Sequence, residues 1–388
     1  METLVLEVRK VMRDYFNTEA PVRFVFPIDG DCLNIYDGEI KEGYLSIKAK
    51  IQAPVNAEIY IDNKKAKYDG QYFVGEVLLK NYRALIVAEN RSEGHQTAIT
   101  VYKLENSVGK YRISLDDNIL CLADLAKNKD VYTSLFDSPY MNVLKKAHDL
   151  YGTKVHMNVF YEYKNDEEDR RRFFGEREYF NLSMMTDKYK DEWKANSDWL
   201  KLSFHSRAEK PDNPYLNATA ECIKEDIQLV HREILRFAGA ESLAEVTTLH
   251  WGACNEDGVH ALRSAGYRGL VGYFSFTESG ETIVAYSYPY DLVKHINGRD
   301  FWVDNKEDIV YCKVDMVLNK YQLNEIVPKL EEICRRKQEI GFVELLMHAQ
   351  YFYPDYRFFS KDFENIILCA SKWLTEHGYQ SALLSEVI

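Results

Sequence analysis

Hydrophobic residues follow two different periods along this chain, and the change near residue 106 divides it into two parts. From about Pro21 to Glu105 apolar and polar residues alternate with period two, as in Tyr44-Leu-Ser-Ile-Lys-Ala-Lys-Ile, and turn residues such as Asp62-Asn63 separate the alternating runs. This alternation is typical of half-buried strands in an antiparallel sheet. From Tyr111 onward, short apolar runs alternate with helical stretches. The two periods predict two domains of different class.

The chain has 388 residues, which is enough for two or three domains at about 100–200 residues each. Residues 1–19 predict an amphipathic N-terminal helix, because charges interrupt the apolar positions at every turn. Residues 20–106 predict a small β-sandwich, which resembles the immunoglobulin-like accessory modules of bacterial carbohydrate enzymes. A spacer role explains such a module as well as a binding role does. Residues 107–388 form the second predicted domain.

The pattern of the second domain indicates repeated strand-then-helix units with short connections. Such units predict a parallel sheet closed into a (β/α) barrel. The predicted strands are Tyr111–Leu115, Lys154–Phe160, Leu200–Phe204, Val246–His250, Arg268–Gly272, 309–315, Phe342–Met347 and Gln380–Leu384. The predicted helices are Ser138–Tyr151, a long helix that ends near Phe237, Glu256–Ala265, Leu323–Gln338 and Lys361–His377, and a β-rich insertion is expected near 282–304. We therefore expect an α/β fold, with a barrel preceded by a small all-β domain.

Composition and charge exclude several kinds of partner. Acidic residues number 61 against 49 basic residues, a formal net charge of −12, and such a field repels nucleic-acid phosphates and anionic lipid. No stretch approaches the roughly 18 apolar residues of a membrane span, and the N-terminus lacks a signal-peptide pattern. The seven cysteines are scattered and form no CxxC, which argues against a disulfide framework. We expect a cytoplasmic protein; the sequence predicts no oligomeric state.

Ionisable side chains follow several of the predicted barrel strands. Asp116 and Asp117 follow the first strand, His205 follows the third, His250 ends the fourth and His348 follows the seventh. A single histidine at a strand end is most often a packing residue, but the carboxyl ends of parallel strands meet at one rim of a barrel. Carboxylate and imidazole ligands suit a divalent ion such as Zn, Co, Ni or Fe and leave a position for water. The sequence therefore predicts a metal site at this rim.

These residues occur in an order that resembles a known family. The order is Ser114-Leu-Asp-Asp, then Leu144-Lys-Lys-Ala-His-Asp-Leu-Tyr-Gly-Thr-Lys-Val-His-Met-Asn-Val-Phe, then His205-Ser, then Leu262-Arg-Ser-Ala-Gly-Tyr-Arg. It is similar to that of the NodB-like polysaccharide deacetylases, which carry a TFDD motif after strand one, an H-S/T-x-x-H motif and a late leucine-histidine motif on a distorted (β/α) barrel. The similarity runs from about residue 110 to the last predicted strand.

The resemblance implies a role for each matching residue. Asp116 matches the catalytic base of the family and Asp117 its metal-binding aspartate. His205 matches the first metal histidine, and His348 matches the late histidine that protonates the leaving amine. The resemblance also implies a divalent metal ion, most simply zinc, and a saccharide substrate that loses an N-acetyl group.

Two departures from the family pattern bear on the site. Glu209 stands where the second metal histidine is expected, so the third ligand is either Glu209 or His250. We favour His250, because a strand holds a ligand more rigidly than a loop does. The family motif Arg-Pro-Pro-Tyr-Gly is replaced by Thr248-Leu-His-Trp-Gly, so the arginine that orients the base in the family is missing. How Asp116 would be activated is left open by the sequence.

Aromatic residues close to these motifs are candidates for sugar binding. Trp251, Tyr351 and Tyr353 could stack on sugar rings, although aromatic clusters pack cores as often. The charged run Asn165-Asp-Glu-Glu-Asp-Arg-Arg-Arg predicts a solvated loop.

Three functional hypotheses follow from the sequence. The first is a metal-dependent deacetylase acting on the amide bond of an N-acetylated saccharide or glycan precursor. The second, motivated by Glu209 and the missing arginine, is a catalytically silent carbohydrate-binding relative. The third is a barrel amidohydrolase that cleaves another C–N bond with the same ion.

Overall fold

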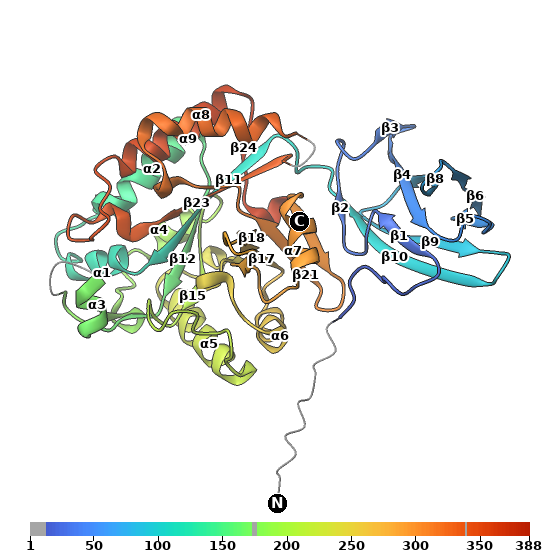
Figure 1. The fold of residues 1–388 in the computed structure, drawn as a ribbon. Coiled ribbons are helices and arrows are strands. Elements are labelled where there is room, and N and C mark those ends of the chain that lie inside the picture. The colour runs from blue at the N-terminus through green and yellow to red at the C-terminus, as the bar shows by residue number, and fades with distance from the viewer. Residues whose placement is uncertain (1–12, 173–176, 338–339) are drawn as a thin grey trace, which may run out of the picture. The chain divides into compact units, whose positions relative to one another are not determined.

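The computed structural model describes residues 13–172, 177–337 and 340–388 (Figure 1). These divide into two compact units, one of residues 13–33 and 37–103 and the other of residues 34–36 and 104–388. Most of the predicted N-terminal helix lies outside the described residues, and residues 13–19 form turns with no helix among them.

The smaller unit consists of two mainly antiparallel sheets. One sheet has the order β1-β4-β8-β7 with β3 beside β4, and the other has the order β2-β10-β9-β5-β6. The strands are β1 (Arg23–Phe26), β2 (Cys32–Leu33), β3 (Glu39–Lys41), β4 (Tyr44–Gln52), β5 (Ile59–Ile61), β6 (Lys64–Lys65), β7 (Lys67–Tyr68), β8 (Phe73–Leu79), β9 (Arg83–Asn90) and β10 (His95–Lys103). Buried residues of both sheets, such as Ile47 in β4 and Ile86 in β9, form one hydrophobic core. The immunoglobulin-like type of this unit stays a prediction.

The larger unit is mixed α/β and contains two sheets. The first sheet is parallel, with the order β15-β12-β11-β23-β22 and β24 beside β11; the second has the order β16-β17-β21-β20 and is parallel except at β20. The first consists of β11 (Lys110–Asn118), β12 (Val155–Phe160), β15 (Leu200–Ser206), β22 (Met316–Val317), β23 (Phe342–His348) and β24 (Gln380–Ser381). The second consists of β16 (Val246–Thr247), β17 (Gly269–Gly272), β20 (Phe301–Asp304) and β21 (Ile309–Lys313).

Hydrogen bonds among the described strands do not close these sheets into the expected barrel. The first sheet ends at β15 and β22 and the second at β16 and β20. On one side, the predicted strand Val246–His250 is reduced to the two residues of β16, because the chain turns into the 3-10 helix η4 (His250–Gly252). On the other side, the antiparallel strand β20 pairs with the edge of β21 that would otherwise face β22.

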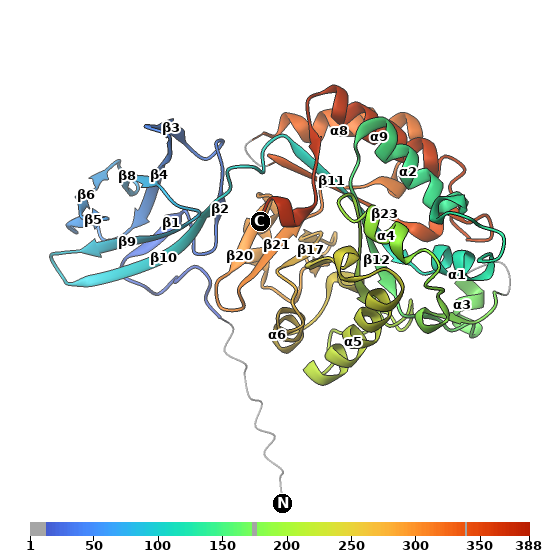
Figure 2. The ribbon, with the colours of Figure 1, turned by 180° about the vertical axis from the view of Figure 1, so that it is seen from behind.

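Helices cover the strands of the larger unit on two sides (Figures 1 and 2). On one side α2 (Pro139–Tyr151), α9 (Phe363–Glu376) and α8 (Leu323–Arg335) pack side by side. On the other side α5 (Ala220–Phe237) packs against α6 (Glu256–Ser264). The apolar stripe of α5 is buried as its 3.6-residue period predicts.

Several short elements were not predicted. The helices among them are α1 (Leu120–Lys127), α3 (Glu167–Arg172), α4 (Lys190–Ala195) and α7 (Tyr290–Asn297), and the strands are β13 (Glu162–Tyr163), β14 (Phe180–Asn181) and β18 (Ser275–Phe276). Strand β19 (Thr282–Ile283) lies in the insertion that was expected to be β-rich. The other 3-10 helices are η1 (Leu135–Asp137), η2 (Leu182–Met184), η3 (Ala240–Ser242), η5 (Leu318–Lys320), η6 (Ala349–Phe352) and η7 (Leu384–Glu386). Thus the charged run expected to be a loop contains α3, and the insertion expected to be β-rich contains α7 between the strands β19 and β20. None of the described helices has the length and apolar character needed to cross a bilayer.

Candidate metal centre

The carboxyl end of β11 carries the two aspartates of the candidate site. Consecutive side chains of a regular strand point to opposite faces, but β11 has a register shift between Leu115 and Asn118 against β12, and Asp117 has a left-handed φ of 61°. Aspartate tolerates this conformation better than most residues do. The bulge breaks the alternation, so that Asp116 and Asp117 can both contribute to the same site.

Asp117 lies in a cluster with two histidines from other elements. His205 comes from the end of β15 and His250 from η4, and the three side chains are almost fully buried, at 6%, 2% and 6% exposure for Asp117, His205 and His250. Asp117 Oδ1 lies 3.1 Å from His205 Nε2 and 3.5 Å from His250 Nδ1, and the two imidazole nitrogens lie 3.1 Å apart. One atom of each side chain therefore points at a common centre.

Backbone carbonyls fix which nitrogen of each histidine carries its hydrogen. His205 Nδ1 contacts the carbonyl oxygen of Thr248, and His250 Nε2 lies 3.1 Å from the carbonyl oxygen of Glu209. A carbonyl only accepts, so these two nitrogens donate, and a neutral imidazole has no second N–H. His205 Nε2, His250 Nδ1 and the carboxylate of Asp117 then direct three lone pairs at one point. This arrangement requires a cation at the centre, either a proton or a metal ion.

The spacing of the three donor atoms matches a tetrahedral ion. With metal–ligand distances of roughly 2.0–2.1 Å, neighbouring ligand atoms of a tetrahedral zinc site lie about 3.3 Å apart. The observed separations of 3.1, 3.1 and 3.5 Å bracket that value. Three protein ligands leave a fourth position open, as in catalytic zinc sites. Asp117, His205 and His250 can thus bind a divalent metal ion.

The pKa values of the cluster follow from burial and from the mutual attraction of its charges. Burial opposes ionisation of Asp117, but the hydrogen bond with His205 and the nearby imidazoles hold the pKa of Asp117 well below its ordinary value. Burial likewise opposes protonation of His205, but Asp116 and Asp117 raise the pKa of His205 to about 9. The cluster is therefore electrostatically suited to a positive charge.

The third donor of this cluster is His250, and Glu209 acts on it through the backbone. The Glu209 side chain lines a small cavity together with Asp117, whereas its carbonyl oxygen accepts the N–H of His250. Gln350 in η6 also contacts Asp117, and its amide Nε2 donates to Asp117 Oδ2. Gln350 thereby holds the aspartate oxygen that faces away from the two histidines. Gln350 was not identified as a site residue from the sequence.

Asn158 in β12 supplies a hydrogen bond to the carboxylate of Asp116. Its Nδ2 donates to Asp116 Oδ1 at 2.6 Å, while its Oδ1 accepts from Ser203 Oγ at 2.6 Å and from Thr247 Oγ1 and the Thr248 N–H at 3.2 Å each. Because the amide oxygen already has these donors, its NH₂ end must face the carboxylate. Asp116 is therefore oriented by a neutral amide.

A directed chain of hydrogen bonds continues from Asn158 into the interior. Arg112 forms a buried bidentate ion pair with Glu344, at 2.6 Å for its shortest contact, and its Nη1 lies 2.7 Å from His156 Nδ1. Arginine can only donate, so His156 accepts there and donates through Nε2 to Ser203 Oγ at 2.8 Å. Burial and the positive charge of Arg112 hold the pKa of His156 well below its ordinary value, which keeps it neutral. Each donor in the chain points toward the amide of Asn158.

The remaining predicted residues lie around this centre. His348 is opposite Asp116 in the register of β11 and β23, and its Nδ1 is 3.0 Å from Asn319 Oδ1. Tyr353 lines a large pocket next to the site, whereas Tyr351 packs against Tyr356, with 5.1 Å between ring centroids. Trp251 follows His250, is 43% exposed and has a left-handed φ of 62°, which is unusual for a bulky residue.

Known proteins show little similarity to this chain in sequence or in structure. No protein-family model matches the chain, and no curated protein matches its sequence. Among solved structures, a 4-alpha-glucanotransferase from Thermococcus litoralis superimposes with a TM-score of 0.44 and 12% identity, covering 72% of this chain and 40% of that chain. At this TM-score the likeness does not establish a common fold, and this chain spans less than half of that enzyme's length.

Proposed function

We propose that this protein is a metal-dependent hydrolase that removes an N-acetyl group from a saccharide, as its resemblance to the NodB-like polysaccharide deacetylases implies. The observation that carries the proposal is the convergence of three lone pairs, from Asp117, His205 and His250, beside the buried carboxylate of Asp116. A carboxylate base next to a three-ligand metal site is the arrangement that metal-assisted amide hydrolysis requires.

Asp117, His205 and His250 would hold the ion, and we propose zinc because one carboxylate and two imidazoles are a frequent zinc ligand set. When bound, such an ion polarises the acyl carbonyl and lowers the pKa of a bound water toward about 7. The cavity lined by Asp117, Glu209 and Gln350 has a volume of about 20 Å³. That volume is sufficient for roughly one water molecule.

Asp116 would act as the general base. Burial raises the pKa of Asp116, an effect partly offset by His205 and His348, and a carboxylate with a raised pKa accepts a proton more readily. Asp116 takes one proton from the attacking water, while the water oxygen forms a bond to the acyl carbon. The amide of Asn158 keeps the accepting carboxylate in place.

His348 would deliver a proton to the leaving nitrogen. Asn319 Oδ1 accepts the N–H at His348 Nδ1, so the ring holds a fixed orientation. Its Nε2 has no hydrogen-bond partner among the described residues and can carry the proton that is transferred. Cleavage of the C–N bond then gives acetate and a free amine.

Two neighbouring substitutions test this proposal. Asp116→Asn is expected to keep stoichiometric metal but lose acetate release from N-acetylhexosamine oligomers, whereas Asp117→Asn is expected to lose both. Metal content is measured by elemental analysis and acetate by an enzymatic assay on the metal-loaded full chain. Acetate release that survives in Asp117→Asn would exclude the mechanism.

The same assay separates the two alternatives. Saccharide binding that is unaffected by chelation, with no turnover of any acetylated sugar, would identify a silent carbohydrate-binding relative. Turnover of a cyclic amide or another N-acyl compound in place of acetylated sugars would identify an amidohydrolase of a different C–N bond.

A further inference from the structure

The two oxygens of the Asp117 carboxylate have different partners. Oδ1 lies 3.1 Å from His205 Nε2 and 3.5 Å from His250 Nδ1. Oδ2 accepts a hydrogen bond from the side-chain amide of Gln350. A carboxylate can only accept, so the NH₂ end of this amide must be the end that faces Asp117. One oxygen of the carboxylate is therefore directed at the centre of the cluster, and the other is held by Gln350.

Other contacts do not explain the position of the Gln350 side chain. The residue is 3% exposed, and its Oε1 is buried with no hydrogen-bond partner among the described residues. Burying an acceptor without a donor lowers the stability of a fold, so each such group calls for an explanation. Within the described part of the chain, the amide makes its hydrogen bond to Asp117. A role toward Asp117 accounts for the position of Gln350, whereas folding stability does not.

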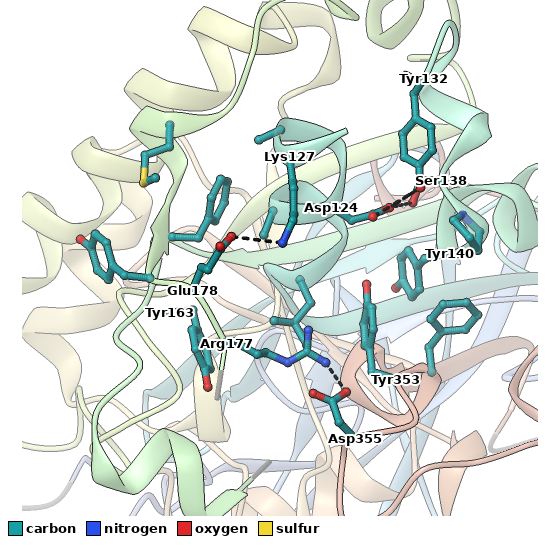
Figure 3. A pocket seen from close by; sticks show the side chains of 18 residues that line it. Asp124, Lys127, Tyr132, Ser138, Tyr140, Tyr163, Arg177, Glu178, Tyr353 and Asp355 are labelled. Atoms are coloured by element: carbon teal, nitrogen blue, oxygen red, sulfur yellow. Dashed lines mark hydrogen bonds and ion pairs between the residues drawn. The ribbon is translucent and has the colours of Figure 1, made fainter. Parts of the chain in front are cut away.

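Gln350 lies on a rigid element. η6 follows β23 directly, and its last residue, Phe352, packs against Tyr140 of α2 with 5.4 Å between ring centroids. The next residue, Tyr353, stacks on the same ring at 6.2 Å and an interplanar angle of 16° (Figure 3). Phe363, at the start of α9, packs against Phe352 at 5.4 Å. Packing of this kind holds a residue that orients a ligand within a narrow range of positions.

Coordination of an ion by both oxygens of Asp117 would break the hydrogen bond with Gln350. Such coordination requires both oxygens at about 2.0–2.6 Å from the ion. The carboxylate would have to turn so that Oδ2 approaches the centre and leaves Gln350 Nε2. Hydrogen bonds to a charged acceptor are stronger than those between neutral groups. Because η6 holds Gln350 in place, this bond favours coordination through Oδ1 alone.

The space beside the cluster limits the number of further ligands. Asp117 Oδ1, His205 Nε2 and His250 Nδ1 supply three donor atoms. The cavity lined by Asp117, Glu209 and Gln350 has a volume of about 20 Å³, which holds roughly one water molecule. Three protein donors and one water suit an ion with four ligands, such as zinc. Magnesium, calcium and manganese prefer six or more ligands, most of them oxygen.

We infer that Gln350 is a positioning residue that restricts Asp117 to coordination through one oxygen and thereby selects ions that accept four ligands. The inference rests on the metal site of the proposed function and specifies which ions that site takes. Without the amide donor, Oδ2 is free to turn toward the centre. The added oxygen donor then favours ions that prefer a larger, oxygen-rich set of ligands.

Cobalt(II) is the probe for the number of ligands, because its visible absorption is intense with four ligands and weak with six. The full chain is freed of metal with a chelator, loaded with cobalt(II) and measured at equal occupancy. The wild-type spectrum is expected to be that of a four-coordinate ion. Gln350→Met keeps the length of the side chain but has no N–H, and its spectrum is expected to weaken as the number of ligands rises.

Competition between zinc and manganese(II) measures the selection. Equilibrium dialysis against both ions, with elemental analysis of the bound metal, gives the ratio of the two affinities. Loss of a group that orients a metal ligand costs about 10- to 100-fold in affinity. The freed Oδ2 compensates this loss for manganese but not for zinc, so the ratio of zinc to manganese affinity in Gln350→Met is expected to fall at least about tenfold.

Asn90→Leu is the matched control for both measurements. Asn90 is also buried and donates its amide to a carboxylate, that of Glu93 at 3.1 Å, but it lies in the smaller unit. This variant loses the same kind of hydrogen bond away from the metal site. It is expected to leave the cobalt(II) spectrum and the ratio of affinities unchanged.

Three results would overturn the inference: a wild-type spectrum of more than four ligands, an unchanged spectrum in Gln350→Met, or an equal loss of both ions in that variant. These results are distinct from failure of the proposed function. If the spectrum and the ratio change as expected but the zinc-loaded wild type releases no acetate, the hydrolase proposal fails and the role of Gln350 stands. If the wild type releases acetate while Gln350→Met keeps the wild-type spectrum and ratio, only the role of Gln350 fails. A wild-type chain that binds no cobalt(II) would overturn both.

Discussion

Replacing Asn158 by aspartate tests how Asp116 keeps its charge in a buried site. Asn158 is fully buried and gives Asp116 its amide hydrogen bond at 2.6 Å. The substitution preserves the shape of the side chain and its acceptor oxygen for Ser203 Oγ. It replaces the donor by a second carboxyl group, and two carboxyls at this distance do not both ionise. The pKa of Asp116 is therefore expected to rise further.

The expected decrease in kcat/KM follows from the loss of the hydrogen bond between Asn158 and Asp116. A hydrogen bond to a charged group contributes about 1.5–3 kcal/mol, and each 1.36 kcal/mol corresponds to a factor of ten in rate. On the acidic side of the pH–rate profile, kcat/KM of the Asn158→Asp variant should fall about 10- to 150-fold. The acidic limb should move to higher pH, and the loss should become smaller at alkaline pH because Asp116 ionises there in both proteins.

The assay is acetate release from N-acetylhexosamine oligomers across the pH range, with metal content measured on the same samples. Asn90→Asp is the matched control, because Asn90 is also buried and donates its amide to a carboxylate, that of Glu93 at 3.1 Å, in the smaller unit. The control should leave the profile unchanged. A loss of the same factor at every pH, or an unchanged profile in Asn158→Asp, would refute the role assigned to this amide.

Three further outcomes are expected. Elemental analysis should find that His250→Ala loses the metal ion and that Glu209→Gln retains it, because Glu209 orients His250 through its backbone carbonyl. Equal loss of metal in both variants would contradict the ligand assignment. In urea unfolding, Glu344→Gln should lower the free energy of unfolding by about 3–5 kcal/mol, because Arg112 would remain buried without its charged partner. The control Glu364→Gln, at the exposed ion pair with Lys146, should lower it by less than about 1 kcal/mol. Burial lowers the pKa of His231 from its ordinary 6.5 to about 4, so between these values the unfolded chain binds a proton that the folded chain does not. The contribution of His231 to the free energy of unfolding is complete above pH 6.5 and is lost toward pH 4, so it should be about 2 kcal/mol smaller at pH 5 than at pH 7.5. His231→Gln should reduce the difference in unfolding free energy between these two pH values by that amount, and an unchanged difference would contradict the assignment.

Local patterns in the sequence determined the longer strands and helices and which side chains share a strand face. Period-two alternation is a property of neighbouring residues, so the strands of the smaller unit could be predicted without knowledge of their partners. The same period places Arg112, Ser114 and Asp116 on one face of β11, and His156 and Asn158 on one face of β12. The order of strand-end residues also predicted Asp117, His205 and His250 as a group, and the structure brings these three together.

Tertiary structure alone decided how those faces meet. The contact between Asn158 and Asp116 joins residues 42 positions apart, and it depends on the register of β11 against β12, which no local pattern contains. The carbonyl oxygens that orient His205 and His250 belong to the backbone, which every residue type shares, so the sequence carries no sign of them. The barrel likewise stays open because β20 pairs with the free edge of β21, and no local pattern predicts that pairing. Periodicity is set by adjacent residues, whereas hydrogen-bond partners are set by the packing of distant ones.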